Sequence, residues 1–91
     1  MKSIWKYDVR VQDADQVFQV HQGATFVACG HTPATLPGCV SLWAMVDTTR
    51  PTENVALRVV GTGHPIEANE TWVGTSIDPT SRFVWHVVQV F

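Results

Sequence analysis

The chain ends in the sequence FVWHVVQVF, residues 83–91. Successive side chains of a β-strand point to opposite sides of the sheet. One side of this segment carries Phe83, Trp85, Val87 and Phe91, and the other carries Val84, His86, Val88 and Val90. A strand that is apolar on both sides is either central in a two-layer β structure or covered by a partner. The ending therefore predicts a buried strand.

Six segments upstream show the alternation or the residue types of further strands. They are residues 4–11, 17–20, 25–29, 40–47, 55–60 and 72–77. Turn-forming residues separate them, and the longest connection is the loop 30–38. Residues 66–70 could form one short helical turn, because Pro65 suits the first position of a helix. The sequence thus predicts an all-β fold of about seven strands, a small antiparallel β-sandwich or partly open barrel, with at most one short helical turn.

The chain is short and has a large content of apolar residues. The 91 residues suffice for a single β domain, 1–91, and 45% of them are hydrophobic, including four Trp and four Phe, while 15% are charged. This composition excludes an intrinsically disordered chain. A domain of this size hides only about two-thirds of the surface that its unfolded chain exposes. The surplus of apolar side chains therefore predicts a homo-oligomer.

The charge balance bears on partners and location. Eight acidic residues outnumber six basic ones, which gives a formal net charge of −2. Proteins that grip duplex nucleic acid through its phosphates carry an excess of Lys and Arg, so no duplex nucleic acid partner is expected. The sequence has no secretory segment and no apolar run near the ~20 residues of a membrane span. We expect a soluble, cytoplasmic protein in which Cys29 and Cys39 stay reduced.

The segment Gly61-Thr62-Gly63-His64-Pro65 is the main candidate for a ligand-binding loop. Two glycines leave backbone N–H groups uncovered, which favours an anion-binding nest. His64 adds a ring nitrogen, and Arg58 lies on the incoming strand. The alternative is a tight corner in which Pro65 ends the strand. A Walker loop is excluded, because the Lys-Ser/Thr ending is missing.

The four tryptophans lie on four different expected strands, at Trp5, Trp43, Trp72 and Trp85. Tryptophan serves cores and interfaces, and it also forms stacking platforms for flat ligands. Trp43 shares its side of the strand with Ser41 and Asp47. We therefore expect Trp43 to be the most exposed of the four and to contribute to the ligand site.

Neither a metal site nor a catalytic site is expected. Cys29, His31 and Cys39 lack the paired spacing of a zinc site, and a fourth ligand would come from His21 or His64. No nucleophile elbow, HExxH motif or interpretable carboxylate pair is present. The sequence predicts a protein that is not an enzyme and has no cofactor.

Four stretches carry a family resemblance: IWKY (4–7), LWAMVD (42–47), GTGHPI (61–66) and FVWHV (83–87). In this order they resemble a family of small uncharacterised bacteriophage and prophage proteins, most specifically over residues 59–66. The chain departs from the family pattern between Cys29 and Cys39, where its loop is longer. The resemblance implies a phage accessory protein that acts in the cytoplasm of the host cell, and it implies no particular activity.

Two binding hypotheses follow. In the first, a homo-oligomer sequesters a small anionic, nucleotide-derived ligand, such as a host defence signal, near a subunit boundary. Arg58, Gly61, Thr62, Gly63, His64 and Trp43 would bind it. In the second, the chain is a protein–protein interaction module that inhibits a host enzyme or joins a phage assembly.

Overall fold

The computed structural model describes residues 1–91 as seven β-strands without a helix. The strands are β1 (Lys2–Arg10), β2 (Gln16–His21), β3 (Thr25–Gly30), β4 (Cys39–Asp47), β5 (Thr52–Gly61), β6 (Glu70–Ile77) and β7 (Val84–Val90). The predicted all-β class and the seven strands are confirmed. The structure therefore contains no helix that could cross a membrane.

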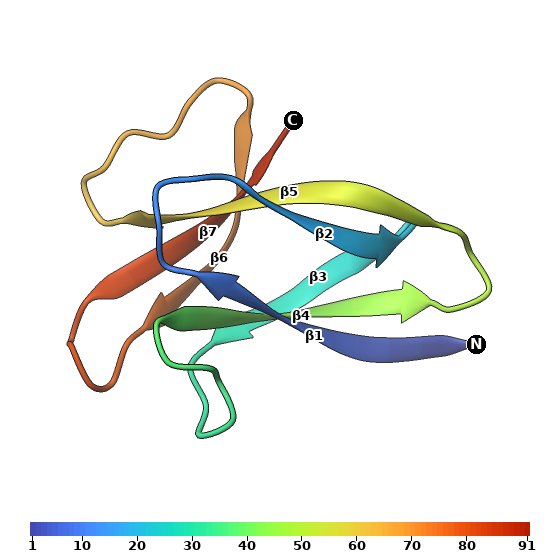
Figure 1. Ribbon diagram of the computed structural model, residues 1–91, viewed down its shortest axis with the longest axis horizontal. Coiled ribbons are helices and arrows are strands. Elements are labelled where there is room, and N and C mark those ends of the chain that lie inside the picture. Colours follow the sequence, from blue (N-terminus) through green and yellow to red (C-terminus); the bar gives the residue numbers. More distant parts are fainter.

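The strands form two antiparallel sheets in two layers (Figure 1). The three-stranded sheet has the order β1-β4-β3, and the four-stranded sheet has the order β2-β5-β7-β6. The molecule is flat, with extents of 38 × 33 × 17 Å. Each sheet therefore has an inner face toward the other sheet and an outer face with no layer on it.

The core lies between the two sheets. Eight buried residues from five strands form it: Val9, Val20, Val40, Leu42, Val55, Leu57, Val59 and Val87. The alternation of β4 is confirmed, since Val40, Leu42, Ala44 and Val46 are all buried. The final strand β7 is central, between β5 and β6, and Val87 and Val88 on its two sides are both fully buried. Only 16 of the 91 residues are buried, so much apolar side-chain surface stays outside this core.

The edges of the two sheets approach each other at two corners. At one corner, β6 crosses so close to β3 that a Cβ atom on Gly74 would lie under 3.0 Å from the Cβ of Cys29. The register of β6 against β7 shifts between Trp72 and Gly74, next to this contact. At the other corner, the Gln16 side chain bonds the N–H and the C=O of Arg10 at 2.7 and 2.8 Å, which joins β2 to β1. The fold is thus a sandwich that is partly closed at its corners.

The helical turn that residues 66–70 could have formed is absent. The segment is an open loop that ends in one reverse turn, in which the Glu70 N–H donates to the Glu67 carbonyl at 3.0 Å. Asn69 bonds both backbone groups of Phe91, at 2.8 and 3.0 Å, which ties the loop to the end of β7. These tertiary bonds override the local preference that Pro65 suggests.

The expectation for Trp43 is also wrong. Its side chain is half-buried on the outer face of the central strand β4, and its ring passes beside Gly30. Trp72 is 59% exposed and Trp5 is 39% exposed. Trp72 is the most exposed because it lies on the edge strand β6, where it has a strand neighbour on one side only.

Candidate functional site

The loop after β5 begins with a tight corner. The His64 N–H donates to the Gly61 carbonyl at 3.1 Å, and Gly63 has a φ of 87°, a value that glycine adopts without strain. A Cβ on Gly61 would lie 3.3 Å from the His64 ring and 3.5 Å from the Trp85 ring. Glycine at position 61 therefore lets the His64 ring fold back over the end of β5. The His64 amide is used inside the turn and does not face a ligand.

Arg58 is committed to an ion pair. Its guanidinium donates to both carboxylate oxygens of Glu70, from Nε at 2.7 Å and from Nη2 at 2.6 Å. The side chains are 17% and 3% exposed. The hydrogen bonds from Arg58 hold the pKa of Glu70 below its usual value, and the same bonds raise the pKa of Arg58. An anionic ligand at Arg58 would have to compete with a bidentate, buried carboxylate.

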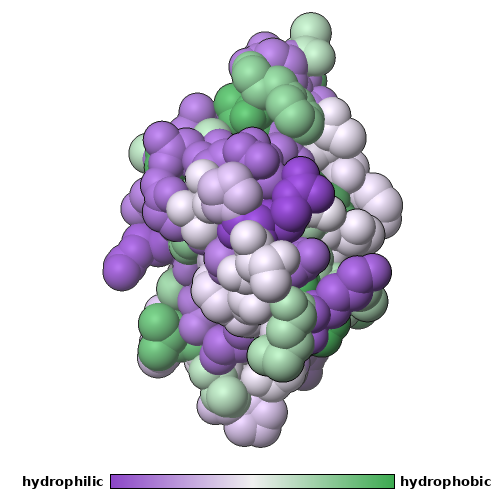
Figure 2. Space-filling model, turned by 90° about the vertical axis from the view of Figure 1, so that its right-hand side faces the viewer, coloured by the Kyte–Doolittle hydropathy of each residue, from purple (hydrophilic) through white to green (hydrophobic).

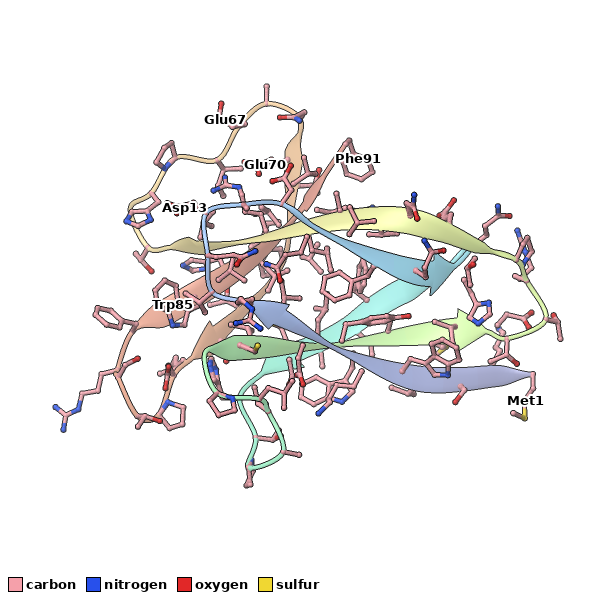
Figure 3. All side chains as sticks on the ribbon, in the orientation of Figure 1. Met1, Asp13, Glu67, Glu70, Trp85 and Phe91 are labelled. Atoms are coloured by element: carbon pink, nitrogen blue, oxygen red, sulfur yellow. The ribbon has the colours of Figure 1, made fainter.

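A hollow of about 420 Å³ opens beside this pair, between the β1–β2 connection and the loop 62–69. Its lining includes the carboxylates of Asp13, Asp15, Glu67 and Glu70, together with Arg58 and His64. Figure 3 shows Asp13, Glu67 and Glu70 gathered around this part of the molecule. Asp13, Asp15 and Glu67 form no ion pair. The hollow is therefore negative, and its charge disfavours an anionic ligand.

His64 separates this acidic hollow from a smaller, aromatic one. The second hollow is about 210 Å³ and is lined by Gly61, Thr62, His64, Phe83, Val84 and Trp85. The rings of Phe83 and Trp85 meet with their centroids 5.5 Å apart. The structure thus brings five of the six expected site residues together at one end of the four-stranded sheet, namely Arg58, Gly61, Thr62, Gly63 and His64. Trp43 lies apart from them, on the outer face of the other sheet.

The outer face of the four-stranded sheet carries a line of hydrogen bonds that the sequence did not reveal. The Trp72 indole N–H donates to Thr75 at 2.9 Å, and Thr75 in turn contacts His86 Nδ1 at 2.8 Å. His86 Nε2 lies 2.9 Å from the Thr62 hydroxyl. The two ring nitrogens of His86 therefore contact hydroxyl groups of Thr75 and Thr62 on its two sides. These bonds fix the exposed Trp72 ring on the sheet.

A second polar cluster, also missed from the sequence, has the residue types of a hydrolase. His31 Nδ1 lies 2.5 Å from the Ser76 hydroxyl, and His31 Nε2 lies 3.9 Å from Asp78. Ser76 is only 5% exposed, and it does not line the hollow of about 270 Å³ beside His31 and Asp78. A substrate in that hollow would meet the histidine but not the serine. We interpret the cluster as a structural contact that holds the start of the loop 31–38 against the end of β6.

Metal ligands are not grouped. No set of three or more His, Cys, Asp or Glu side chains is arranged to hold a metal ion. Cys29 and Cys39 are free thiols, and burial raises the pKa of Cys29 to about 11. At this pKa the thiol is almost fully protonated near neutral pH.

The chain matches one family, described as a domain of unknown function (DUF7352), over residues 1–90. The protein therefore belongs to this family, and the match covers the whole β domain. No curated protein and no solved structure matches the chain significantly.

Proposed function

We propose that this protein is a non-enzymatic binding module that recognises a protein surface through the outer face of the sheet β2-β5-β7-β6. The observation that carries the proposal is the exposure of three large apolar side chains on the two edge strands of that face. Val17, Trp72 and Ile77 are 63%, 59% and 68% exposed. The strand register places all three on the side opposite the core. No layer of this chain covers that side.

The arrangement of this face suits protein recognition. Trp72 offers a large ring whose N–H is already bonded to Thr75, so contact with a partner costs little side-chain ordering. Tryptophan is the residue type most enriched among the energetically dominant residues of interfaces. Half-buried Val84 pairs with Ile77 and half-buried Val90 pairs with Glu70, and the polar pair of Thr75 and His86 lies between these two rows. By contrast, the end of the molecule at the β4–β5 turn is a mixture in which hydrophilic residues occupy the centre (Figure 2).

The charges of the site favour this function over capture of a small anion. The only basic side chain of the acidic hollow, apart from the histidine, is Arg58, which Glu70 neutralises. Three further carboxylates face the same space without a counter-ion. An anionic nucleotide would therefore meet net repulsion at the residues that the sequence suggested for it.

Position-specific photo-cross-linking tests the proposal. A photoreactive benzoylphenylalanine replaces Ile77 on the outer face of the four-stranded sheet, or Ile4 on the outer face of the other sheet. Ile4 is the matched control because its side chain is 50% exposed. The variants are irradiated in the cells that express the protein. We expect a defined cross-linked protein adduct from position 77 and a much weaker one from position 4. Equal or absent adducts at the two positions would refute the proposal.

A further inference from the structure

We infer that the partner of this sheet face is a basic segment of another protein, which places a lysine or arginine side chain in the acidic hollow and a neighbouring apolar side chain in the aromatic hollow. This inference rests on the proposed function, because it names the chemistry of the protein that the face binds. The acidic hollow is the one lined by Asp13, Asp15, Glu67 and Glu70, and the aromatic hollow is the one lined by Phe83 and Trp85.

Part of the acidic hollow belongs to the outer face of the four-stranded sheet. Arg58, Glu70 and Val90 line it, and they come from the neighbouring strands β5, β6 and β7. Arg58 points outward because Leu57 beside it on β5 points into the core. Trp72 lies two residues after Glu70 on β6, so both side chains are on the same side of the sheet. A partner that covers Trp72 therefore also covers this hollow.

The uncompensated charge of the hollow is negative on two sides. Asp13 and Asp15 come from the β1–β2 connection, and Glu67 comes from the loop 62–69. Figure 3 shows Glu70 between Asp13 and Glu67. The hydrogen bond with Glu70 raises the pKa of Arg58 most, and the charges of Asp15 and Glu67 add to this effect, so both carboxylates act on the same space. Because Glu70 already neutralises Arg58, three carboxylates remain for a cation from outside.

The aromatic hollow gives the bound segment a second contact. His64 lines both hollows, so the two are neighbours. Phe83 is 61% exposed, and its ring meets the ring of Trp85. Val84 also lines this hollow, and it pairs with Ile77 on the outer face. The binding face thus continues from the acidic hollow, past His64, to Ile77.

Charge complementarity selects a basic segment as the occupant. Lysine and arginine carry their charge at the end of a long apolar stem, so one such side chain can reach between the carboxylates while its backbone stays on the sheet face. The acidic hollow, at about 420 Å³, has the volume of a ligand-binding cleft. An acidic segment would meet like charges there. A second copy of this chain is also disfavoured, because its net charge is −2.

Fluorescence anisotropy with labelled peptides tests the inference. The first probe is a fluorescein-labelled hexapeptide that alternates lysine and leucine. The second probe has serine in place of each leucine, and the third has glutamate in place of each lysine. At low salt the first probe should bind the wild-type protein, the second should bind about fivefold more weakly, and the third should not bind. Binding of the third probe as tight as that of the first overturns the inference.

Matched charge reversals locate the binding. Glu67→Lys reverses a charge of the acidic hollow, and Glu53→Lys makes the same change near the start of β5, at the opposite end of that strand. The variants have equal net charge, and both residues are exposed, so the fold should persist. Glu67→Lys should weaken the first probe about tenfold and Glu53→Lys by no more than about twofold. The difference should largely disappear at about 1 M salt, where charges are screened over ~3 Å. Equal effects of the two variants overturn the inference.

A second pair of variants tests the apolar contact. Phe83→Ser should weaken the first probe about fivefold and leave the second probe, which has no leucine, unchanged. Leu36→Ser is the control, because Leu36 is 58% exposed in the loop 31–38. It should affect neither probe. If Phe83→Ser weakens both probes equally, the aromatic hollow does not hold the apolar side chain, and this part of the inference is wrong.

The inference and the proposed function fail in different ways. With benzoylphenylalanine at position 77, Glu67→Lys should reduce the adduct formed in cells, and Glu53→Lys should not. If the adduct and the first probe are both insensitive to Glu67→Lys, the basic segment is wrong and the binding face stands. If position 77 gives no adduct, the proposed function is wrong and the inference falls with it. An adduct of twice the chain mass would identify a second copy and overturn the inference alone.

Discussion

Gly74→Ala tests the corner at which the two sheets meet. The added Cβ would lie under 3.0 Å from the Cβ of Cys29 and 3.3 Å from its sulfur. Carbon atoms in contact normally lie about 3.5–4.0 Å apart, so β3 and β6 must separate by several tenths of an ångström or more. The obstructing atom is a Cβ fixed to the backbone, so a rotamer change cannot relieve the contact.

The expected cost is near the upper end of the range for overpacked cores, about 3 kcal/mol of unfolding free energy. In a domain of this size that loss lowers the melting temperature by about 15 °C. Urea unfolding followed by tryptophan fluorescence, and thermal unfolding followed by circular dichroism, measure the two quantities.

Second-site variants identify the atom responsible. Cys29→Gly removes the Cβ that the methyl group added at position 74 would strike, so the double variant should recover about 2 kcal/mol relative to the sum of the single variants, as a double-mutant cycle reports. Cys29→Ala removes the sulfur and keeps that Cβ, so it should recover little. The reasoning is refuted if Gly74→Ala unfolds within about 0.5 kcal/mol of the wild type, a change typical of surface substitutions. Equal rescue by both Cys29 variants would also refute it.

Four further outcomes are expected. Glu70→Gln leaves the Arg58 guanidinium largely buried without its counter-ion and should cost about 3 kcal/mol of unfolding free energy in urea, whereas adding Arg58→Met should recover part of it. Because the folded-state pKa of Glu70 is below its usual value of 4.5, the pair stabilises fully above that pH and loses its contribution as the pH falls through the folded-state pKa. Unfolding free energies between pH 6 and pH 3 should therefore fall more steeply in the wild type than in Glu70→Gln. Tyr7→Phe removes a buried hydroxyl that has no hydrogen-bond partner, so stability should stay constant or rise by up to about 1 kcal/mol in the same urea assay. With a thiol pKa of about 11, Cys29 should react with iodoacetamide at pH 8 far more slowly in the folded protein than in urea, as mass spectrometry would show, and a fast native reaction would contradict its burial.

The strands could be predicted from the sequence because their signal is local. A period of two in β4 places Val40, Leu42, Ala44 and Val46 on one side, and all four are buried. The apolar character of both sides of β7 likewise predicted a buried strand, either central or covered by a partner, and β7 is central in its sheet. Neither inference needs knowledge of which strands are neighbours, because each depends only on the alternation within one strand.

The site could be predicted only in part, because its chemistry depends on strand order. Arg58 pairs with Glu70 across β7, and nothing local indicates that β5 and β6 flank the same strand. Without this pairing, Arg58 resembles a cation that is available to a ligand. The same applies to His86, whose partners Thr62 and Thr75 come from both sides of β7. Sequence alone therefore predicted a loop after Gly61 but could not establish the charge of the side chains around it.

The burial of Val88 explains why the outer face is apolar where it is. Val88 points away from the core and is nevertheless fully buried. Its cross-strand neighbours are Arg58 on β5 and Trp72 on β6, so their long side chains flank it on the two sides. In place of a third layer, the sheet covers the outward valine with its own side chains. One of these covering side chains, Trp72, is itself apolar and is 59% exposed. Apolar surface therefore still faces the solvent above Val88. A strand that is apolar on both sides thus creates an apolar outer face even when its own residues are buried. For this reason, the removal of Trp72 should affect both the stability of the sheet and the binding of a partner, whereas the removal of Ile77 should affect binding alone.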